Sequence, residues 1–82
     1  MKIHQLKCES KYFQLTLDGK KDFEIRKDDR HFNVGDRLIL CEINGENEYT
    51  GRLIVTDVMS IVTYEQKTGY VVMGIHPLAP TR

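Results

Sequence analysis

The sequence predicts an α+β fold that is mostly β, with five or six short strands and one short helix after the first strand. Several runs of the chain are apolar or alternate between apolar and polar residues, and Gly, Asn, Asp or Pro separates them. The first run, residues 2–7, is expected to be a strand with Ile3 facing the core and Leu6 as a second candidate, whereas residues 11–18 have the apolar spacing of an amphipathic helix. At 82 residues the chain (1–82) forms one domain, and so small a sheet hides its edges best by curling or closing.

The helix has recognisable start and stop signals. Ser10 is a candidate N-cap, because its side chain can accept a backbone N–H. Phe13 and Leu17 lie four residues apart and are expected on the buried face. Gly19 suits the left-handed residue that follows a helix C-terminus. Because the helix is short, packing against the sheet must hold it.

The second strand, residues 22–27, is unusually rich in charge. Phe23 and Ile25 alternate with charged residues, which predicts that these two side chains face the core. The charged set is then expected on the opposite face, where Glu24 and Arg26 lie two residues apart.

The rest of the chain is expected to form three more strands, over residues 37–43, 52–58 and 70–76. The run 37–43 is the most apolar, which predicts a central strand covered on both faces. Phe32 is expected to anchor the polar loop before it, and Gly35 suits a tight turn. Gly51 indicates a bulge, and the pattern of residues 59–69 does not distinguish strand from loop.

The composition limits the classes of partner. The chain is 40% hydrophobic and 29% charged, as is typical of a globular protein, and its formal net charge is zero. Tight, sequence-independent duplex binding normally needs a basic excess and is therefore disfavoured. A short single strand, an RNA loop or a single nucleotide stays open as a ligand.

The two cysteines, Cys8 and Cys41, belong to no CxxC pair, so neither a zinc site nor a disulfide framework is expected, and each is interpreted as a small apolar filler. No metal or cofactor is predicted. The chain shows no signal core or membrane-length apolar run, which favours a cytoplasmic protein without a membrane partner. The sequence leaves the oligomeric state open between a monomer and a weak dimer. Three histidines are expected at the surface or at strand edges: His4, His31 and His76.

One motif connects the charged strand to a known family. Residues 19–26 fit the pattern G-x-K-x-x-E-x-R through Gly19, Lys21, Glu24 and Arg26. A V-G-D turn follows at residues 34–36, and the run G-Y-V-V-M-G-I lies near the C-terminus at residues 69–75. In these features the chain resembles ASCH domains (activating signal cointegrator homology), above all the compact stand-alone proteins of bacteria and their phages.

The resemblance implies a PUA-like β-barrel that binds RNA or nucleotides in a cleft beside the motif. One branch of the family resembles amidohydrolases that act on acetylated cytidine, and another is linked to RNA cleavage. In the amidohydrolase branch a threonine works with the motif lysine and stands where this chain has Glu24. Lys21 therefore matches that branch, whereas Glu24 departs from it.

Lys21, Glu24 and Arg26 are the main candidate site. A carboxylate between two cations fixes both side chains and leaves N–H donors for a phosphate or a base edge. The alternative is a solvated ion-pair cluster that contributes little to stability. Gly19 is first a backbone requirement and second a place where a ligand approaches closely.

Other candidates surround this set. Asp29 and Arg30 form either part of the site or a structural ion pair that closes the loop. Tyr64, and less so Tyr70, is a candidate for stacking on a base, with core packing as the alternative. Lys20 and Lys27 are expected to be surface charges that add positive potential at the rim. None of the candidate residues is predicted to bind a metal ion.

Three functions follow from the sequence in order of preference. The first is an RNA- or nucleotide-binding module. The second is a small hydrolase, an amidohydrolase or ribonuclease, in which Lys21 acts as the base beside Glu24 on an acylated nucleoside or RNA. The third is a phage-type protein-interaction module, which predicts a large exposed apolar patch instead of a polar cleft.

Overall fold

The computed structural model describes residues 1–63 and 65–78 and has the predicted order of elements. The described residues form five strands and one helix: β1 (Ile3–Glu9), α1 (Ser10–Leu17), β2 (Phe23–Lys27), β3 (Arg37–Ile43), β4 (Tyr49–Val62) and β5 (Tyr70–Pro77). β4 continues into the segment 59–69, whose first residues are therefore a strand. None of the helices in the described residues has the length and apolarity needed to span a membrane.

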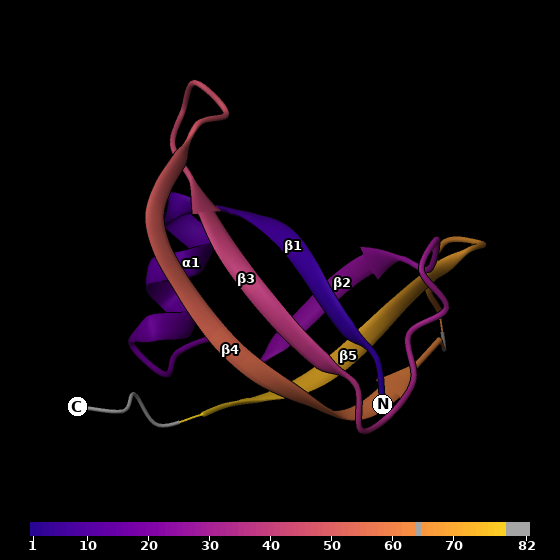
Figure 1. Cartoon of the computed structure of the whole chain (residues 1–82). Helices are drawn as coiled ribbons and strands as arrows, with labels where there is room; N and C mark the ends of the chain where they lie inside the picture. The colour runs from indigo at the N-terminus through magenta and orange to yellow at the C-terminus, as the bar shows by residue number, and fades with distance from the viewer. Residues whose placement is uncertain (64, 79–82) are drawn as a thin grey trace.

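The strands form one sheet in the order β1-β3-β4-β5-β2. β1 and β3 are parallel, and the other neighbouring pairs are antiparallel. The sheet curls into a half-barrel, so that the edge strands β1 and β2 turn toward each other, and α1 lies beside one end of the sheet (Figure 1). The predicted fold class, mostly β with one short helix after the first strand, is confirmed.

The core lies inside the curl of the sheet. Phe13 from α1 and Phe32 from the loop before β3 are buried in it, as predicted for both residues. The strands contribute alternate apolar residues to the same cluster: Leu6, Cys8, Leu38, Leu40, Ile54, Val58, Val71, Met73 and Ile75. Burial of this cluster is the main favourable contribution to folding, since the helix is too short to be stable alone.

The end of α1 is the predicted glycine stop. Gly19 has φ of 75°, its N–H donates to the carbonyl of Thr16, and the N–H of Lys20 donates to the carbonyl of Leu15. This pair of bonds is a Schellman motif, and it turns the chain from α1 into β2. The predicted cap at the other end is wrong, because Glu9 is the N-cap and the Ser10 hydroxyl donates to the carbonyl of Ile43 at 2.9 Å.

One predicted core position in α1 and one in β1 are exposed. Leu17 is 52% exposed, because Thr16 occupies the buried face of α1 beside Phe13. Ile3 is 59% exposed, because the inward residues of β1 begin with His4. His4 was expected at the surface, and that expectation is wrong. The other two histidines are exposed, as expected.

His4 is buried because it has a polar partner inside the half-barrel. Its Nε2 lies 2.9 Å from Oδ2 of Asp36, and its ring meets the ring of Phe32 edge-on, with the centroids 4.8 Å apart. The backbone N–H groups of Lys2 and Asn33 donate to the same carboxylate. A histidine with such partners can replace an apolar residue at an inward position.

β3 is less covered than its apolar sequence suggests. It has a strand on each side, and Leu38 and Leu40 are buried, but β4 is the middle strand of the sheet. The outward residues of β3 are only half-buried, so the prediction of cover on both faces is wrong. The predicted bulge is present: the register between β3 and β4 shifts opposite Gly51, whose φ is 93°.

Candidate functional site

β2 presents its charged face to the interior, which reverses the predicted orientation. Glu24 is 3% exposed, whereas Phe23 and Ile25 are 39% and 52% exposed. The alternation along the strand was predicted correctly, but the assumption that the apolar face is the buried one was wrong. The buried carboxylate is tolerated because two cations neutralise it.

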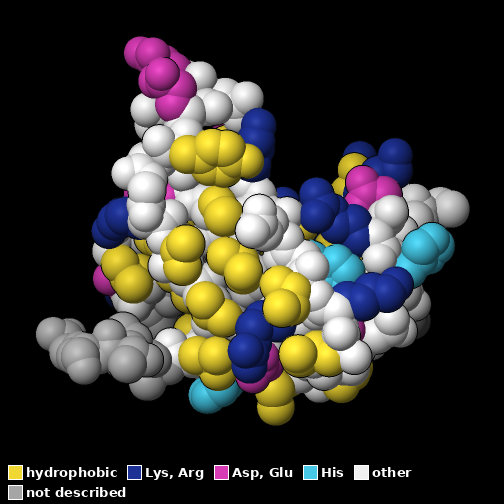
Figure 2. All heavy atoms as spheres, in the orientation of Figure 1, with side chains coloured by type: hydrophobic (Ala, Val, Ile, Leu, Met, Phe, Trp, Pro, Cys, Tyr) yellow, Lys and Arg dark blue, Asp and Glu magenta, His cyan; other side chains and the backbone are white. Residues whose placement is uncertain are grey.

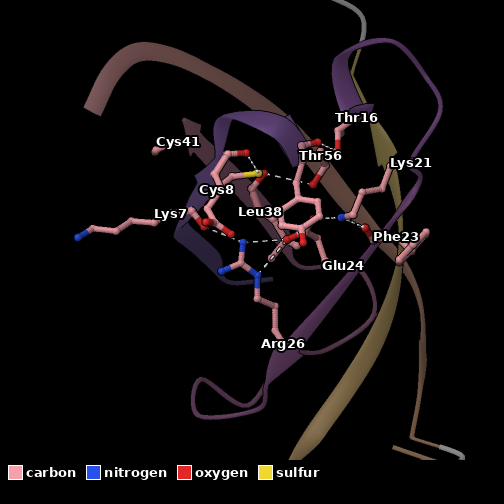
Figure 3. Close-up of polar contacts among 12 residues, drawn as sticks. Lys7, Cys8, Thr16, Lys21, Phe23, Glu24, Arg26, Leu38, Cys41 and Thr56 are labelled. Atoms are coloured by element: carbon pink, nitrogen blue, oxygen red, sulfur yellow. Dashed lines mark hydrogen bonds and ion pairs between the residues drawn. The ribbon is translucent and has the colours of Figure 1, made fainter. Parts of the chain in front are cut away.

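Glu24 lies between Lys21 and Arg26, as the sequence predicted (Figure 3). Its Oε2 accepts from Nζ of Lys21 at 2.6 Å. Its Oε1 accepts from Nε of Arg26 at 2.9 Å and lies 2.8 Å from Nη2 of the same guanidinium. Each carboxylate oxygen is therefore matched with one cation, and the carboxylate fixes the positions of both.

Lys21 follows the turn at Gly19 and points back over the start of β2. Its Nζ also donates to the carbonyl of Phe23 at 2.5 Å. The ammonium lies 4.8 Å from the centroid of the Phe23 ring and 5.9 Å from that of Tyr12. The lysine is thus held by a carboxylate, a carbonyl and two aromatic rings.

The two edge strands are joined by arginine side chains. Nη2 of Arg26 donates to the carbonyl of Lys7 at 2.8 Å, and Nη1 of Arg30 donates to the carbonyl of Gln5 at 2.9 Å. We call this junction, between residues 5–9 and β2, the seam. The guanidinium groups satisfy carbonyls that an edge strand otherwise leaves open to pairing with another chain.

A pocket of about 550 Å³ opens on the seam beside α1. We call it the seam pocket. Its walls are mostly apolar and come from α1, β2 and β3: Tyr12, Leu15, Phe23, Ile25 and Ile43. Charged residues and one thiol complete its lining: Lys7, Cys8, Glu9, Lys20, Lys21, Glu24 and Arg26. Its volume is within the range of sites that bind small molecules.

The seam pocket is locally positive although the chain is neutral overall. Four of its lining residues are Lys or Arg, and two are Glu. Lys20 is exposed and belongs to this lining, in agreement with the predicted surface charge that adds positive potential at the rim. An anionic ligand is therefore favoured over a cationic one.

Cys8 lines the pocket as a neutral thiol. Burial, followed by the nearby Glu24 carboxylate, raises the pKa of Cys8 to about 11. A thiol with so high a pKa is a poor nucleophile and a poor metal ligand at neutral pH. Among the residues that the structure describes, no three His, Cys, Asp or Glu side chains group as a metal site requires.

The remaining predicted residues that the structure describes are not part of the seam pocket lining. Gly19 is not part of its lining, and its role is the backbone turn that delivers Lys21. Asp29 is exposed, and Arg30 bonds to the carbonyl of Gln5 instead of forming the suggested ion pair. Tyr64, the stacking candidate, lies outside the described residues. Tyr70, the other tyrosine candidate, lines a separate depression together with Ile25, Gln66 and Lys67.

The aromatic and aliphatic walls of the pocket were not predicted from the sequence. Tyr12 flanks the apolar stripe of α1, and the alternation in β2 assigned Phe23 and Ile25 to the core. A correct prediction that Glu24 points inward would have placed Phe23 and Ile25 on the outer side of β2, beside the pocket. Nothing local in the sequence, however, distinguishes the two faces of β2. Lys7 was missed because it comes from a different edge strand.

A second buried glutamate, Glu42 of β3, has a different environment. Its Oε1 and Oε2 accept from Nε and Nη2 of Arg52, both at 2.9 Å, and the Thr50 hydroxyl donates to Oε1 at 2.6 Å. Hydrogen bonds from Arg52 and then Thr50 lower the pKa of Glu42 to about 2. The Arg52 guanidinium lies 5.0 Å from the centroid of the Phe13 ring.

The outer face of the sheet carries exposed apolar side chains. Figure 2 shows hydrophobic side chains gathered over β3 and β4. Ile3, Leu53 and Met59 are each more than half exposed, and Ile39 and Val55 between them are half-buried. The structure therefore contains both the apolar patch expected of an interaction module and a charged pocket.

Two comparisons place the chain among known proteins. It matches the family described as a domain of unknown function, DUF3850, over residues 3–75, which include Lys21, Glu24 and Arg26. It is also 47% identical over 64 residues to a protein of Escherichia phage P2 described as an uncharacterized 12.9 kDa protein in the GpA 3′ region. The match covers 73% of this chain and 57% of that protein, so the chain spans little more than half the length of its relative.

Proposed function

We propose that this chain, which belongs to the DUF3850 family, binds single-stranded RNA or a nucleotide in the seam pocket. One observation carries the proposal: the buried Glu24 carboxylate holds Lys21 and Arg26 in place on the wall of a pocket with a positive excess. Cations fixed in this way meet an anionic ligand without first losing side-chain entropy.

Arg26 keeps donors for a ligand. A guanidinium has five N–H donors, and the contacts of Arg26 with Glu24 and Lys7 use Nε and Nη2. Within the described part of the chain Nη1 of Arg26 has no hydrogen-bond partner, so both of its N–H groups are available to a phosphate or a base edge. A charged N–H donor that is held in place in this way forms a strong hydrogen bond to a phosphate oxygen.

The resemblance to ASCH domains supports the same proposal. It concerns the residues that form the centre of the site: Lys21, Glu24 and Arg26. The neutral net charge supports a short single strand or a nucleotide over a duplex, since long phosphate tracks need a wider basic surface. The PUA-like assignment and the RNA ligand are the parts of the proposal that rest on this resemblance.

Two arginines provide a matched test. Arg26→Ala and Arg52→Ala each remove a guanidinium that is paired with a buried glutamate, but only Arg26 lines the seam pocket. Binding of a fluorescent oligoribonucleotide, measured across salt concentrations, is expected to weaken about tenfold in Arg26→Ala, with a salt slope lower by about 1. Arg52→Ala is expected to bind like the wild type. Equal binding by Arg26→Ala and wild type, with both folded by circular dichroism, would contradict the proposal.

The hydrolase alternative rests on the resemblance alone. The Lys21 ammonium donates to Glu24 and to the Phe23 carbonyl, so its use as a base requires breaking both contacts. Turnover of an acylated cytidine by the wild type, and its loss in Lys21→Ala, would favour this alternative over a binding module. Absence of turnover across a panel of acylated nucleosides would remove its support.

A further inference from the structure

We infer that the seam pocket holds one unpaired nucleotide, with its base against the wall formed by Tyr12 and Phe23 and its phosphate at the lysine and arginine side chains of the lining. The inference rests on the proposed function and names the unit that the site recognises. It also assigns the base contact to two aromatic residues outside the charged set.

The first support is the mixture of chemistries in one pocket. Tyr12 and Phe23 are 41% and 39% exposed, which leaves part of each ring open to solvent beside Lys21. An inorganic phosphate would make no use of apolar walls, and a purely apolar ligand would make none of the cations. A planar base linked to a phosphate matches both surfaces, because bases stack on aromatic side chains.

The second support is the polar base of the pocket. Arg26 lies beside the apolar walls, held there by the buried Glu24 carboxylate, and its Nη1 N–H groups remain as donors within the site. The edge of a nucleobase carries acceptors that can pair with such donors. An alkyl carboxylate has no donor or acceptor at its apolar end and would leave these donors without a partner.

The third support is the closure of the seam beyond the pocket. The bond from Arg26 to the carbonyl of Lys7 crosses the seam, and the bond from Arg30 to the carbonyl of Gln5 crosses it again two residues further along β1. A nucleic acid strand that followed the seam toward Gln5 would have to pass over or displace these two arginine contacts. This favours a single nucleotide in the pocket, with any neighbouring nucleotides leaving over the rim.

The test compares ligands of increasing size on the wild-type protein. Calorimetric titration uses inorganic phosphate, ribose 5-phosphate, a nucleoside, a nucleoside 5′-monophosphate and an eight-nucleotide single-stranded RNA, with decanoate as an apolar anion. The monophosphate is expected to bind within about tenfold of the oligonucleotide, and the nucleoside and ribose 5-phosphate each about tenfold or more below the monophosphate. Decanoate is expected to bind more weakly than the monophosphate.

Variants then test the aromatic wall. Phe23→Leu and Tyr12→Leu keep the walls apolar but remove a ring, and each is expected to weaken monophosphate binding about fivefold or more. Leu53→Ala is the control, because Leu53 is an apolar residue that is 57% exposed on the outer face and lies outside the lining. The thermal midpoint of each variant shows that it is folded.

The outcomes separate the two proposals. If the oligonucleotide binds and the monophosphate does not, or if neither ring variant weakens binding, the single-nucleotide inference is wrong and the binding module stands. If decanoate binds as tightly as the monophosphate, the inference is also wrong. If no RNA and no nucleotide binds, the proposed function itself fails.

Discussion

Glu24 and Glu42 are both buried glutamates of the same half-barrel, yet they serve different ends. Glu42 receives a two-pronged contact from Arg52 and a hydroxyl from Thr50. Glu24 is held from two directions, by Lys21 from the turn after α1 and by Arg26 from its own strand. Glu24 lines the seam pocket, whereas Glu42 does not belong to its described lining.

The difference shows how one kind of ion pair takes two roles. The guanidinium of Arg52 turns back over the Phe13 ring and fastens β4 to the region of α1. The cations around Glu24 instead retain donors beside apolar walls. A saturated buried pair contributes to the fold, whereas a buried carboxylate that holds cations at a pocket prepares them for a ligand. Four experiments test this contrast, beginning with the largest expected effect.

Glu24→Ala is expected to have the largest effect on stability. It leaves Lys21 and Arg26 facing each other without the carboxylate, although both can rehydrate through the pocket. The expected loss in free energy of unfolding is about 3 kcal/mol, the lower end of the range for a broken buried ion pair. Glu9→Ala, at an exposed glutamate of the same pocket, is the control, with a change within about 0.5 kcal/mol in urea unfolding. A Glu24→Ala change as small as that of the control would show that the cluster is solvated.

Acid is expected to weaken the closed clusters. Hydrogen bonds from His4 and then from the backbone of Lys2 lower the pKa of Asp36 from 3.8 to about 2, and that of Glu42 falls from 4.5 to about 2. The unfolded chain therefore binds more protons than the folded chain between about pH 4.5 and about pH 2. The stability from these carboxylates is fully present above about pH 4.5 and is lost as the pH falls through about 2.

Thermal midpoints measured from about pH 6 to about pH 2 check this direction. Glu42→Gln is expected to lower the midpoint at neutral pH and to give a flatter acid profile than the wild type. Parallel profiles for the two proteins would contradict the assignment of this acid sensitivity to Glu42.

The contrast also explains what the sequence predicts and what it does not. The order of elements, the stop at Gly19 and the bulge at Gly51 were predicted because turn residues act locally. The grouping of Lys21, Glu24 and Arg26 was predicted from a short motif whose members lie within six residues.

The faces of the strands were harder to predict. Period-2 alternation identifies two faces of β2 but not which face is buried, and the rule that apolar residues point inward failed at Phe23 and at Ile3. At Ile3 the rule failed because β1 buries His4, whose partner Asp36 is 32 residues away, and no local pattern marks that pair. At Phe23 it failed because β2 buries Glu24, whose partners Lys21 and Arg26 are close in the chain but do not reveal which face of the strand is inward.

Gly19→Ala is expected to have the smallest effect. The residue has φ of 75° and open space around it, so a methyl group meets no atom but the backbone is strained by about 1 kcal/mol. Gly45→Ala is the control, since Gly45 also lies in open space and lacks a positive φ. Urea unfolding is expected to rank Gly19→Ala below Gly45→Ala, and equal stabilities would remove the strain argument for the turn that delivers Lys21.

The most direct test of the site is the map of backbone amide shifts when a short single-stranded RNA is added to the labelled protein. We expect the shifted residues to cluster at the seam pocket, around Lys7, Lys21 and Phe23, while the amides of Arg52 and Leu53, outside the pocket lining, stay unchanged. Shifts confined to the apolar outer face of β3 and β4, or no shifts at all, would contradict the proposal that the pocket held by Glu24 is the binding site.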